Sequence, residues 1–125
     1  MDLARQQIYG HFRARAHQVF VSSYLYIEEG TTIYANQSTE AASAPALVIL
    51  PGATLDAVGT ATAPITMTTN AANAGQQRGL WGGLIVMGDA TVYGGTDEVE
   101  GITGYYYGGS DDDDNSGTLS YVRVW

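Results

Sequence analysis

The sequence contains no cysteine and no lysine. Without cysteine the chain forms neither a disulfide framework nor a thiolate metal site. Its five basic residues are all arginine and stand against 13 acidic residues, for a net charge of -8. This balance argues against nucleic acid as a partner, because phosphate binding requires a basic face. No stretch approaches the roughly 20 apolar residues of a transmembrane helix, so we expect no transmembrane segment.

What the chain has in abundance is glycine and tyrosine, 16 and nine residues in a length of 125. Together with many threonines and valines, this composition indicates strands joined by tight turns in one domain. Residues 1–20 differ, because they hold three of the five arginines and a single acid. Apolar residues at nearly helical spacing within 2–18 predict a basic helix that caps the remainder, and a remnant of a targeting peptide is the alternative. We therefore expect a helical segment at 1–20 and a β-domain at 21–125, with no clear secretory signal at the start.

One pattern recurs in residues 25–35, 47–57 and 84–94. Each copy has two apolar residues at period 2, then glycine or aspartate, then threonine followed by another apolar residue. The first two copies start 22 residues apart and the next two 37 apart, which is one coil and one coil with an insertion. Self-similarity at such a period is typical of a solenoid.

The period-2 pairs predict strands with one face turned inward, and residues 64–67 and 119–124 supply a third type of strand. Three strands per turn predict an all-β fold, a short right-handed parallel β-helix of about three coils. A β-sandwich does not predict this repetition in register.

The segments Arg78–Val92 and Gly104–Val124 also carry a resemblance. They resemble a large family of bacterial cell-surface β-helix proteins, mostly of unassigned function and similar in architecture to pectate-lyase-like folds. The resemblance covers residues 21–125 and implies an extracellular or cell-surface location. The family continues for several coils beyond the strand at 121–124, so we expect an uncapped final coil here.

Seven of the 13 acids lie between positions 97 and 114, which makes this the most charged part of the chain. Oxygen ligands this close together suit calcium, a hard cation. The spacing is not that of an EF-hand loop, so a solvated acidic loop is the alternative. The candidate metal ligands are Asp111, Asp112, Asp113, Asp114 and Asn115.

Tyrosine rings are candidates for stacking on sugars. The repeat places Tyr34, Asp56 and Tyr93 in one outward column, and three consecutive tyrosines follow later in the chain. The alternative is that tyrosine serves here only as a good strand former. The candidate carbohydrate-binding residues are Tyr34, Tyr93, Tyr105, Tyr106 and Tyr107.

A second outward column is apolar, where a solvated face should be polar. A sheet that is apolar on both faces is covered on both faces, so the N-terminal helix or another protein should lie there. Trp125, a bulky aromatic in the last strand, also fits contact with a neighbour. The candidate partner-binding residues are Tyr26, Val48, Leu50, Ile85, Met87 and Trp125.

Catalytic groups are sparse. The repeat contains no lysine or histidine, because both histidines lie within 1–20, and the repeat places Asp56 and Asp89 in different registers. We therefore expect a non-catalytic structural or binding module that forms a homo-oligomer or binds a protein partner. The alternative is a carbohydrate-binding or carbohydrate-active β-helix fragment that uses calcium.

Overall fold

The computed structural model of the chain describes residues 8–15, 18–35, 44–69 and 79–125, and these residues form strands and turns with no helix among them. Strands are expected from the many β-branched and aromatic residues. Within the described residues, nothing resembles a helix that crosses a membrane. The strands are β1 (Ile8–Arg15), β2 (Gln18–Ile27), β3 (Thr32–Ala35), β4 (Ala46–Ile49), β5 (Thr54–Val58), β6 (Ile65–Thr69), β7 (Gly83–Val86), β8 (Asp97–Glu98), β9 (Tyr106–Tyr107), β10 (Gly117–Ser120) and β11 (Val122–Val124).

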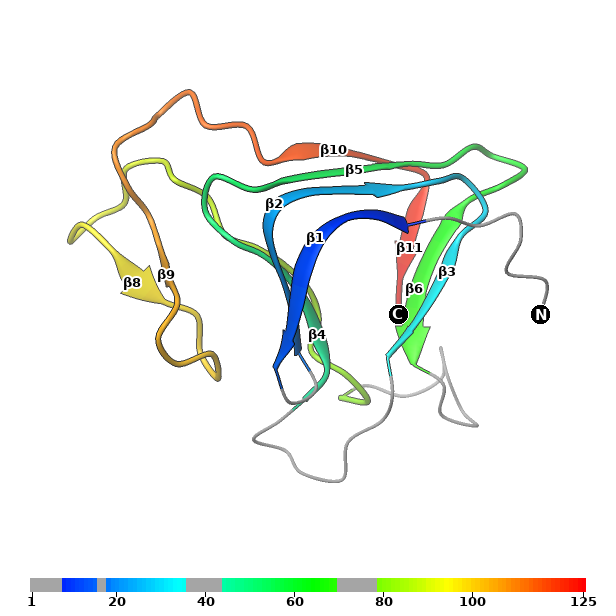
Figure 1. The fold of residues 1–125 in the computed structure, drawn as a ribbon, viewed down its shortest axis with the longest axis horizontal. Helices are drawn as coiled ribbons and strands as arrows, with labels where there is room; N and C mark the ends of the chain where they lie inside the picture. The colour runs from blue at the N-terminus through cyan, green and yellow to red at the C-terminus, as the bar shows by residue number, and fades with distance from the viewer. Residues whose placement is uncertain (1–7, 16–17, 36–43, 70–78) are drawn as a thin grey trace.

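All strands except β1, β8 and β9 wind into a parallel solenoid with three faces (Figure 1). β2 bends midway, so its residues 18–21 pair with β4 and its residues 24–27 pair with β5. The first face stacks the start of β2 on β4 and β7, and the second stacks the end of β2 on β5 and β10. The third face stacks β3, β6 and β11. Coil 1 is thus β2 and β3, coil 2 is β4 to β6, and coil 3 is β7, β10 and β11. The predicted all-β fold of parallel coils is confirmed.

Side chains of similar kind lie above one another inside the solenoid and form the main core. Ile49 of coil 2 is in register with Val21 of coil 1 and with Val86 of coil 3. Each fully buried aliphatic side chain contributes roughly 1.5–3 kcal/mol. The buried members of this core are Val21, Leu25, Ile27, Leu47, Ile49, Ala53, Leu55, Ala57, Ile65 and Met67.

The repeat seen in the sequence aligns coil 1 incorrectly. Leu47 and Leu84 do pair on the first face, as expected, but Leu25 pairs with Leu55 on the second face. The reason is that each coil turns more than one corner, and a glycine of positive φ follows an apolar pair at two of them. Gly30, with φ 76°, precedes the third face, whereas Gly52, with φ 77°, precedes the second. Local pattern alone does not distinguish these corners.

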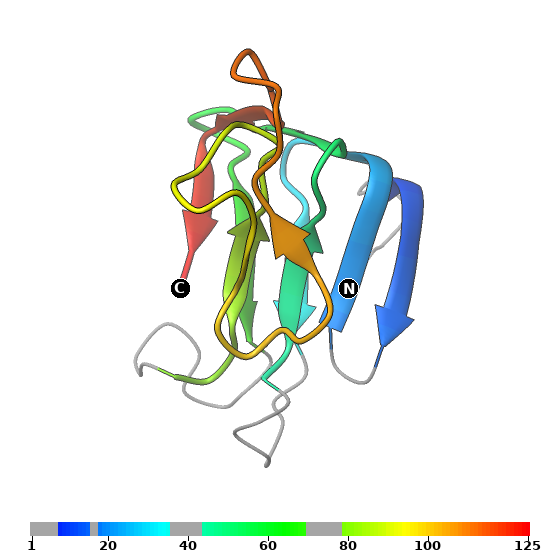
Figure 2. The same cartoon turned by 90° about the vertical axis from the view of Figure 1, so that its left-hand side faces the viewer.

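Strand β1 replaces the helix expected near the N-terminus. It runs antiparallel to β2 along both halves of that strand, from Ile8 opposite Ile27 to Arg15 opposite Gln18, with a bulge after Gly10 (Figure 2). The helix prediction is therefore wrong for residues 8–15, and its other residues lie outside the described ones. An open edge of β2 offers backbone partners to all of β1, which outweighs a weak helical spacing. The boundary expected between residues 20 and 21 falls inside β2.

Candidate functional surfaces

The outer side of the first face is covered by the chain itself. After β7 the chain leaves the solenoid as a lobe, residues 87–116, which contains the β8–β9 hairpin and returns to begin β10. Figure 2 shows this lobe lying across the first face. The ring of Tyr105 stacks on Phe20 of β2, with 4.3 Å between centroids and 14° between planes. The second core formed under the lobe contains Phe20, Ala46, Val48, Met87 and Ile102, with Leu50, Ile85, Val99, Tyr105 and Tyr107 packed against it.

This cover corrects the partner surface expected from the sequence. Val48 and Met87 are buried under the lobe, and Leu50 and Ile85 pack beside them, so these four side chains do not face a partner. The expectation that the apolar column is covered agrees with this packing, but the cover is the insertion rather than an N-terminal helix or another protein. The signal for it is the alternation of apolar residues with glycine and acids in residues 95–116, between the third copy of the repeat and the last strand.

Tyr26 lies on a different face from the rest of that expected column. It is on the outer side of the second face, in register with Asp56 of β5. Its neighbour Tyr24 donates a hydrogen bond from its hydroxyl to Asp56 Oδ2 at 3.2 Å. Desolvation, this hydrogen bond and the charge of Asp56 raise the pKa of the Tyr24 hydroxyl. The second face therefore presents two exposed tyrosines beside one carboxylate.

The other tyrosines proposed for sugar stacking do not form a common surface. Tyr34 is exposed on β3 of the third face, whereas Tyr93 is exposed at a turn of the lobe. Tyr105 and Tyr107 turn toward the second core, and Tyr106 between them points to solvent. The column expected to hold Tyr34 and Tyr93 is wrong, because it relied on the misaligned coil 1 and on a coil 3 strand at 91–94.

The acidic segment 111–114 fastens the base of the lobe. At this base the two arms of the lobe pair through bonds from Gly108 N to Gly88 O at 2.9 Å and from Gly109 N to Ala90 O at 3.0 Å. Two carboxylates then accept backbone N–H groups of the outgoing arm. Asp114 Oδ2 accepts from Asp89 N at 2.9 Å, and Asp112 Oδ1 accepts from Thr91 N at 3.0 Å.

These hydrogen bonds define the chemistry of the acidic segment. Bonds from the Thr91 hydroxyl and backbone hold the pKa of Asp112 below its usual value. Asn115 Oδ1 accepts from Gly117 N at 2.9 Å and so starts β10. Among the described residues, no three Asp, Glu or His side chains are grouped to hold a metal ion. Calcium binding by this segment stays a prediction.

The coil 3 end of the solenoid has the most exposed apolar interior. The inward side chains of coil 2, Ile49, Ala57 and Met67, are 0% exposed. Their partners in register in coil 3 are Val86, Leu119 and Val124, which are 44%, 51% and 49% exposed. The difference arises because coil 3 covers coil 2, whereas no described strand covers coil 3.

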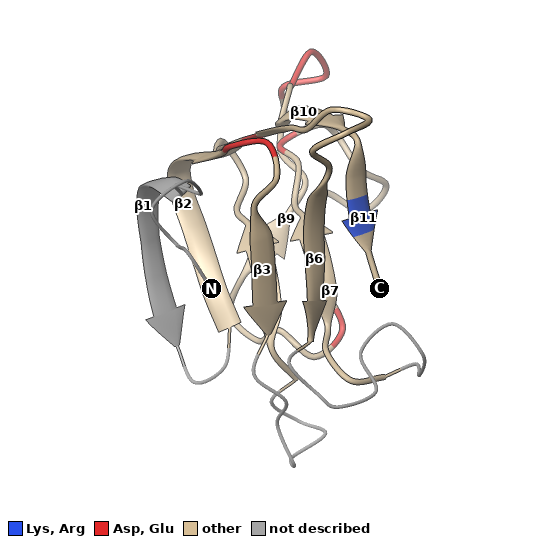
Figure 3. Ribbon diagram, turned by 90° about the vertical axis from the view of Figure 1, so that its right-hand side faces the viewer, with Lys and Arg blue, Asp and Glu red and all other residues tan. Residues whose placement is uncertain are grey.

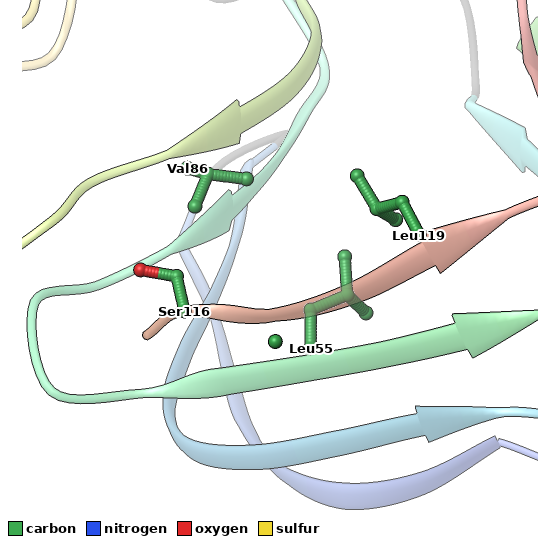
Figure 4. A pocket seen from close by; sticks show the side chains of 5 residues that line it. Leu55, Val86, Ser116 and Leu119 are labelled. Atoms are coloured by element: carbon green, nitrogen blue, oxygen red, sulfur yellow. The ribbon is translucent and has the colours of Figure 1, made fainter. Parts of the chain in front are cut away.

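A hollow of about 110 Å³ opens at this end. It lies between β10 and the start of the third coil, and Figure 4 shows Leu119 of β10 and Val86 of β7 on opposite sides of it. The other lining residues are Leu55, Ser116 and Gly117. None of these side chains is charged, so the hollow suits an apolar side chain rather than an ionic substrate.

β11 and Trp125 also lie at the coil 3 end of the solenoid. Trp125 is exposed, and its backbone N–H donates to Met67 O at 3.2 Å while its carbonyl accepts from Trp81 Nε1 at 2.8 Å. β11 forms the rim of the third face, and Figure 3 shows one basic band on it, where Arg123 is the basic residue. Trp125 therefore stands beside the open interior, and its predicted contact with a partner stays a prediction.

Comparisons with known proteins agree with this architecture. The family model described as a pectate-lyase-like β-helix domain matches residues 10–125. No curated protein and no solved structure matches the chain. The match spans β2 to β11 and most of β1, so it includes the lobe and the open coil as well as the buried coils.

Proposed function

The chain belongs to the family of pectate-lyase-like β-helix domains, and we propose that it is a non-catalytic structural module that receives β-strands of a protein partner at the end of coil 3. The proposed setting is an extracellular or cell-surface assembly. One observation carries the proposal, namely the half-exposed inward side chains Val86, Leu119 and Val124 beside fully buried counterparts in coil 2.

The backbone at this end supports the same proposal. Within the described residues, β7, β10 and β11 each have a strand neighbour on one side only. A free edge exposes N–H and C=O groups that pair readily with another strand, and proteins commonly protect such edges with charges or proline. These three strands contain no proline and one charge, Arg123. The edges are therefore suited to strand addition, which is a recurring mode of protein recognition.

The absence of lysine and the apolar lining of the hollow support a role without catalysis. The two carboxylates considered from the sequence as a possible hydrolase pair are Asp56 and Asp89. They belong to separate parts of the fold. Asp56 bonds Tyr24 on the second face, and Asp89 pairs through its backbone with the acidic segment at the base of the lobe. Such dispersed acids do not form the paired carboxylates of glycoside hydrolysis.

A matched pair of valine variants tests the proposal. Val86→Glu places a charge in the open interior, whereas Val58→Glu makes the same change at a valine of similar exposure, 46%, on β5 in coil 2. Each variant and the unaltered chain are immobilised and exposed to extract of the native source. We expect proteins retained by the unaltered chain and by Val58→Glu to be lost with Val86→Glu, because a buried unpaired carboxylate opposes association.

Hydrogen exchange then locates the contact. Retained partners should slow backbone exchange in 83–86, 117–120 and 122–124, since strand addition protects edge amides. Equal retention by both valine variants would contradict the proposal. So would protection confined to the lobe or to β1.

Carbohydrate binding is the second candidate function, favoured by the outer side of the second face. Tyr24 and Tyr26 offer two aromatic rings, and Asp56 offers a hydrogen-bond acceptor for sugar hydroxyls. A glycan array with and without calcium tests this function. We expect Tyr24→Ala to abolish glycan binding, whereas Tyr34→Ala, which removes an exposed tyrosine from the third face, should leave it unchanged. Loss of turnover of any glycan on changing Asp56 to Asn would instead indicate an enzyme.

A further inference from the structure

The outer side of the second face carries charge of one sign. Its strands are residues 24–27 of β2, together with β5 and β10, and Asp56 is the one charged residue among them. Glu28 and Glu29 follow at the corner between β2 and β3, which Figure 3 shows as an acidic segment. The basic residue Arg123 lies on the third face instead. The electrostatic potential over the second face is therefore negative.

The side chains on this outer side combine aromatic rings, a carboxylate and a hydroxyl. Tyr24 and Tyr26 both point outward, because the residue between them is buried and side chains alternate along a strand. Asp56 lies beside Tyr26 in register, and Thr118 of β10 lies beside Asp56. This row crosses three stacked strands, which span roughly 9–10 Å from the first to the last. Its length is comparable to two linked sugar rings.

The carboxylate of Asp56 is held next to the aromatic rings. The Tyr24 hydroxyl donates to Asp56 Oδ2 at 3.2 Å, and none of the described residues donates a hydrogen bond to the other oxygen, Oδ1. The pKa of the Tyr24 hydroxyl is raised by desolvation and by this contact with Asp56, in agreement with a negative local potential. A cation at this place is attracted both by the carboxylate and by the negative faces of the rings. The surface is thus complementary to an ammonium group carried on a ring that stacks on tyrosine.

We propose that the glycan recognised by the second face carries free amino groups, as a polymer of glucosamine does, and that Asp56 binds the ammonium group while Tyr26 stacks on the sugar ring. This inference rests on the carbohydrate binding proposed above as the second candidate function and names its ligand class. A neutral glycan gains stacking and hydrogen bonds here but no ion pair. A polymer of uronic acids is repelled by Asp56, Glu28 and Glu29.

Calorimetric titration with three glycans tests the ligand class. Two are oligomers of glucosamine and of N-acetylglucosamine with the same linkage and length, so they differ only in the acetyl group that removes the charge. The third is an oligomer of galacturonic acid. Mildly acidic buffer keeps the amines protonated and carboxylates ionised. We expect the glucosamine oligomer to bind about tenfold more tightly than the other two or better, as one charge-assisted hydrogen bond provides, and to bind more weakly as salt rises.

Matched variants assign the preference to one carboxylate. Asp56→Asn keeps an oxygen that accepts the Tyr24 hydrogen bond but removes the charge. It should weaken binding of the glucosamine oligomer by about tenfold and abolish the preference over the acetylated oligomer. Asp113→Asn makes the same change at an exposed carboxylate of the acidic segment and should retain the preference. Tyr26→Ala should weaken binding of both oligomers, since stacking does not require the charge. Circular dichroism verifies that each variant is folded.

The remaining outcomes distinguish the ligand class from carbohydrate binding itself. Equal binding of the amino and acetylated oligomers, lost with Tyr26→Ala, would retain carbohydrate binding and overturn the charged ligand. A preference for the galacturonic acid oligomer would overturn it as well. Equal losses with Asp56→Asn and Asp113→Asn would attribute the preference to net charge rather than to this site, again against the inference. Binding of none of the three glycans would overturn both carbohydrate binding and the inference that rests on it.

Discussion

The edge strands at the two ends of the solenoid differ in how they are paired. At the first end β1 turns back and pairs with β2, so the edge of coil 1 is used within the chain on the first and second faces, while β3 on the third face has β6 as its one neighbour among the described strands. At the other end, coil 3 has free edges among the described strands and inward side chains that are about half exposed. The comparison shows that an antiparallel strand closes a parallel stack, since it offers no further parallel register to a new coil.

Removing β1 should have the largest effect on this contrast. Deleting residues 1–15 leaves the first and second faces of coil 1 without their covering strand. Inward residues such as Leu25 and Ile27 would then approach the exposure of Leu119. We expect a loss on the order of 4 kcal/mol of unfolding free energy, from several partly exposed side chains, together with aggregation. Urea denaturation and light scattering measure both, and an unchanged midpoint would show that β1 is dispensable.

Adding a methyl group at Gly117 should release coil 3 from coil 2. Gly117 has φ 122°, and a Cβ there would overlap the carbonyl oxygen of Leu55 in the neighbouring strand. We expect Gly117→Ala to cost about 3–4 kcal/mol, from backbone strain and displacement of β10. Gly52→Ala is the control, since its positive φ remains but no atom lies within 4 Å of the added Cβ. Equal costs in urea denaturation would contradict the close contact.

Truncating one leucine in each coil tests the burial difference directly. Leu55 is 1% exposed in coil 2, whereas Leu119 lies in the open coil on the same face. Leu55→Ala should lose about 2–5 kcal/mol, as expected for a buried leucine. Leu119→Ala should lose about 1 kcal/mol or less, because much of its surface already contacts water. Measurements in dilute monomer avoid any contribution from association, and similar losses would show that coil 3 is packed as tightly as coil 2.

Acid should have the smallest effect, and it should act on the lobe. The pKa of Asp112 is lowered in the folded chain, so its bonds to Thr91 stabilise the fold above the unfolded pKa. That contribution is lost as the pH falls through the lowered pKa, below about pH 4. Hydrogen exchange in 92–109 should therefore accelerate in acid more for the unaltered chain than for Asp112→Asn. Identical acid responses would remove Asp112 from the attachment of the lobe.

The structural features that could be predicted from the sequence are those that depend on local interactions. The period-2 pairs Leu47 with Ile49 and Leu84 with Val86 predicted inward strands and their register, because strand alternation is a local property. The register of Leu25 was mispredicted, because the glycine turns after different faces look alike. Val86 and Leu119 had been recognised as strand residues, whereas the expectation of an uncapped final coil stays a prediction.

Features that depend on distant segments were not predictable in the same way. Val48 was recognised as outward and covered, but nothing near it identified Tyr105 and Ile102 as the covering residues. The strand at 8–15 likewise forms because β2 presents a free edge, which is a tertiary condition rather than a local preference. Asp112 and Asp114 were read as metal ligands, yet their oxygens accept backbone N–H groups that lie more than 20 residues away.

The lobe has a consequence for how such a chain tolerates change during evolution. The corner between the first and second faces takes residues 50–53 in coil 2 but residues 87–116 in coil 3, and β10 still pairs with β5 in register. Loop-closure entropy grows only with the logarithm of length, so this difference costs about 2 kcal/mol. The apolar contacts of Ile102 and Tyr105 with the first face offset that cost. Corners of this solenoid are thus places where new segments can be inserted while the stacked coils keep their register.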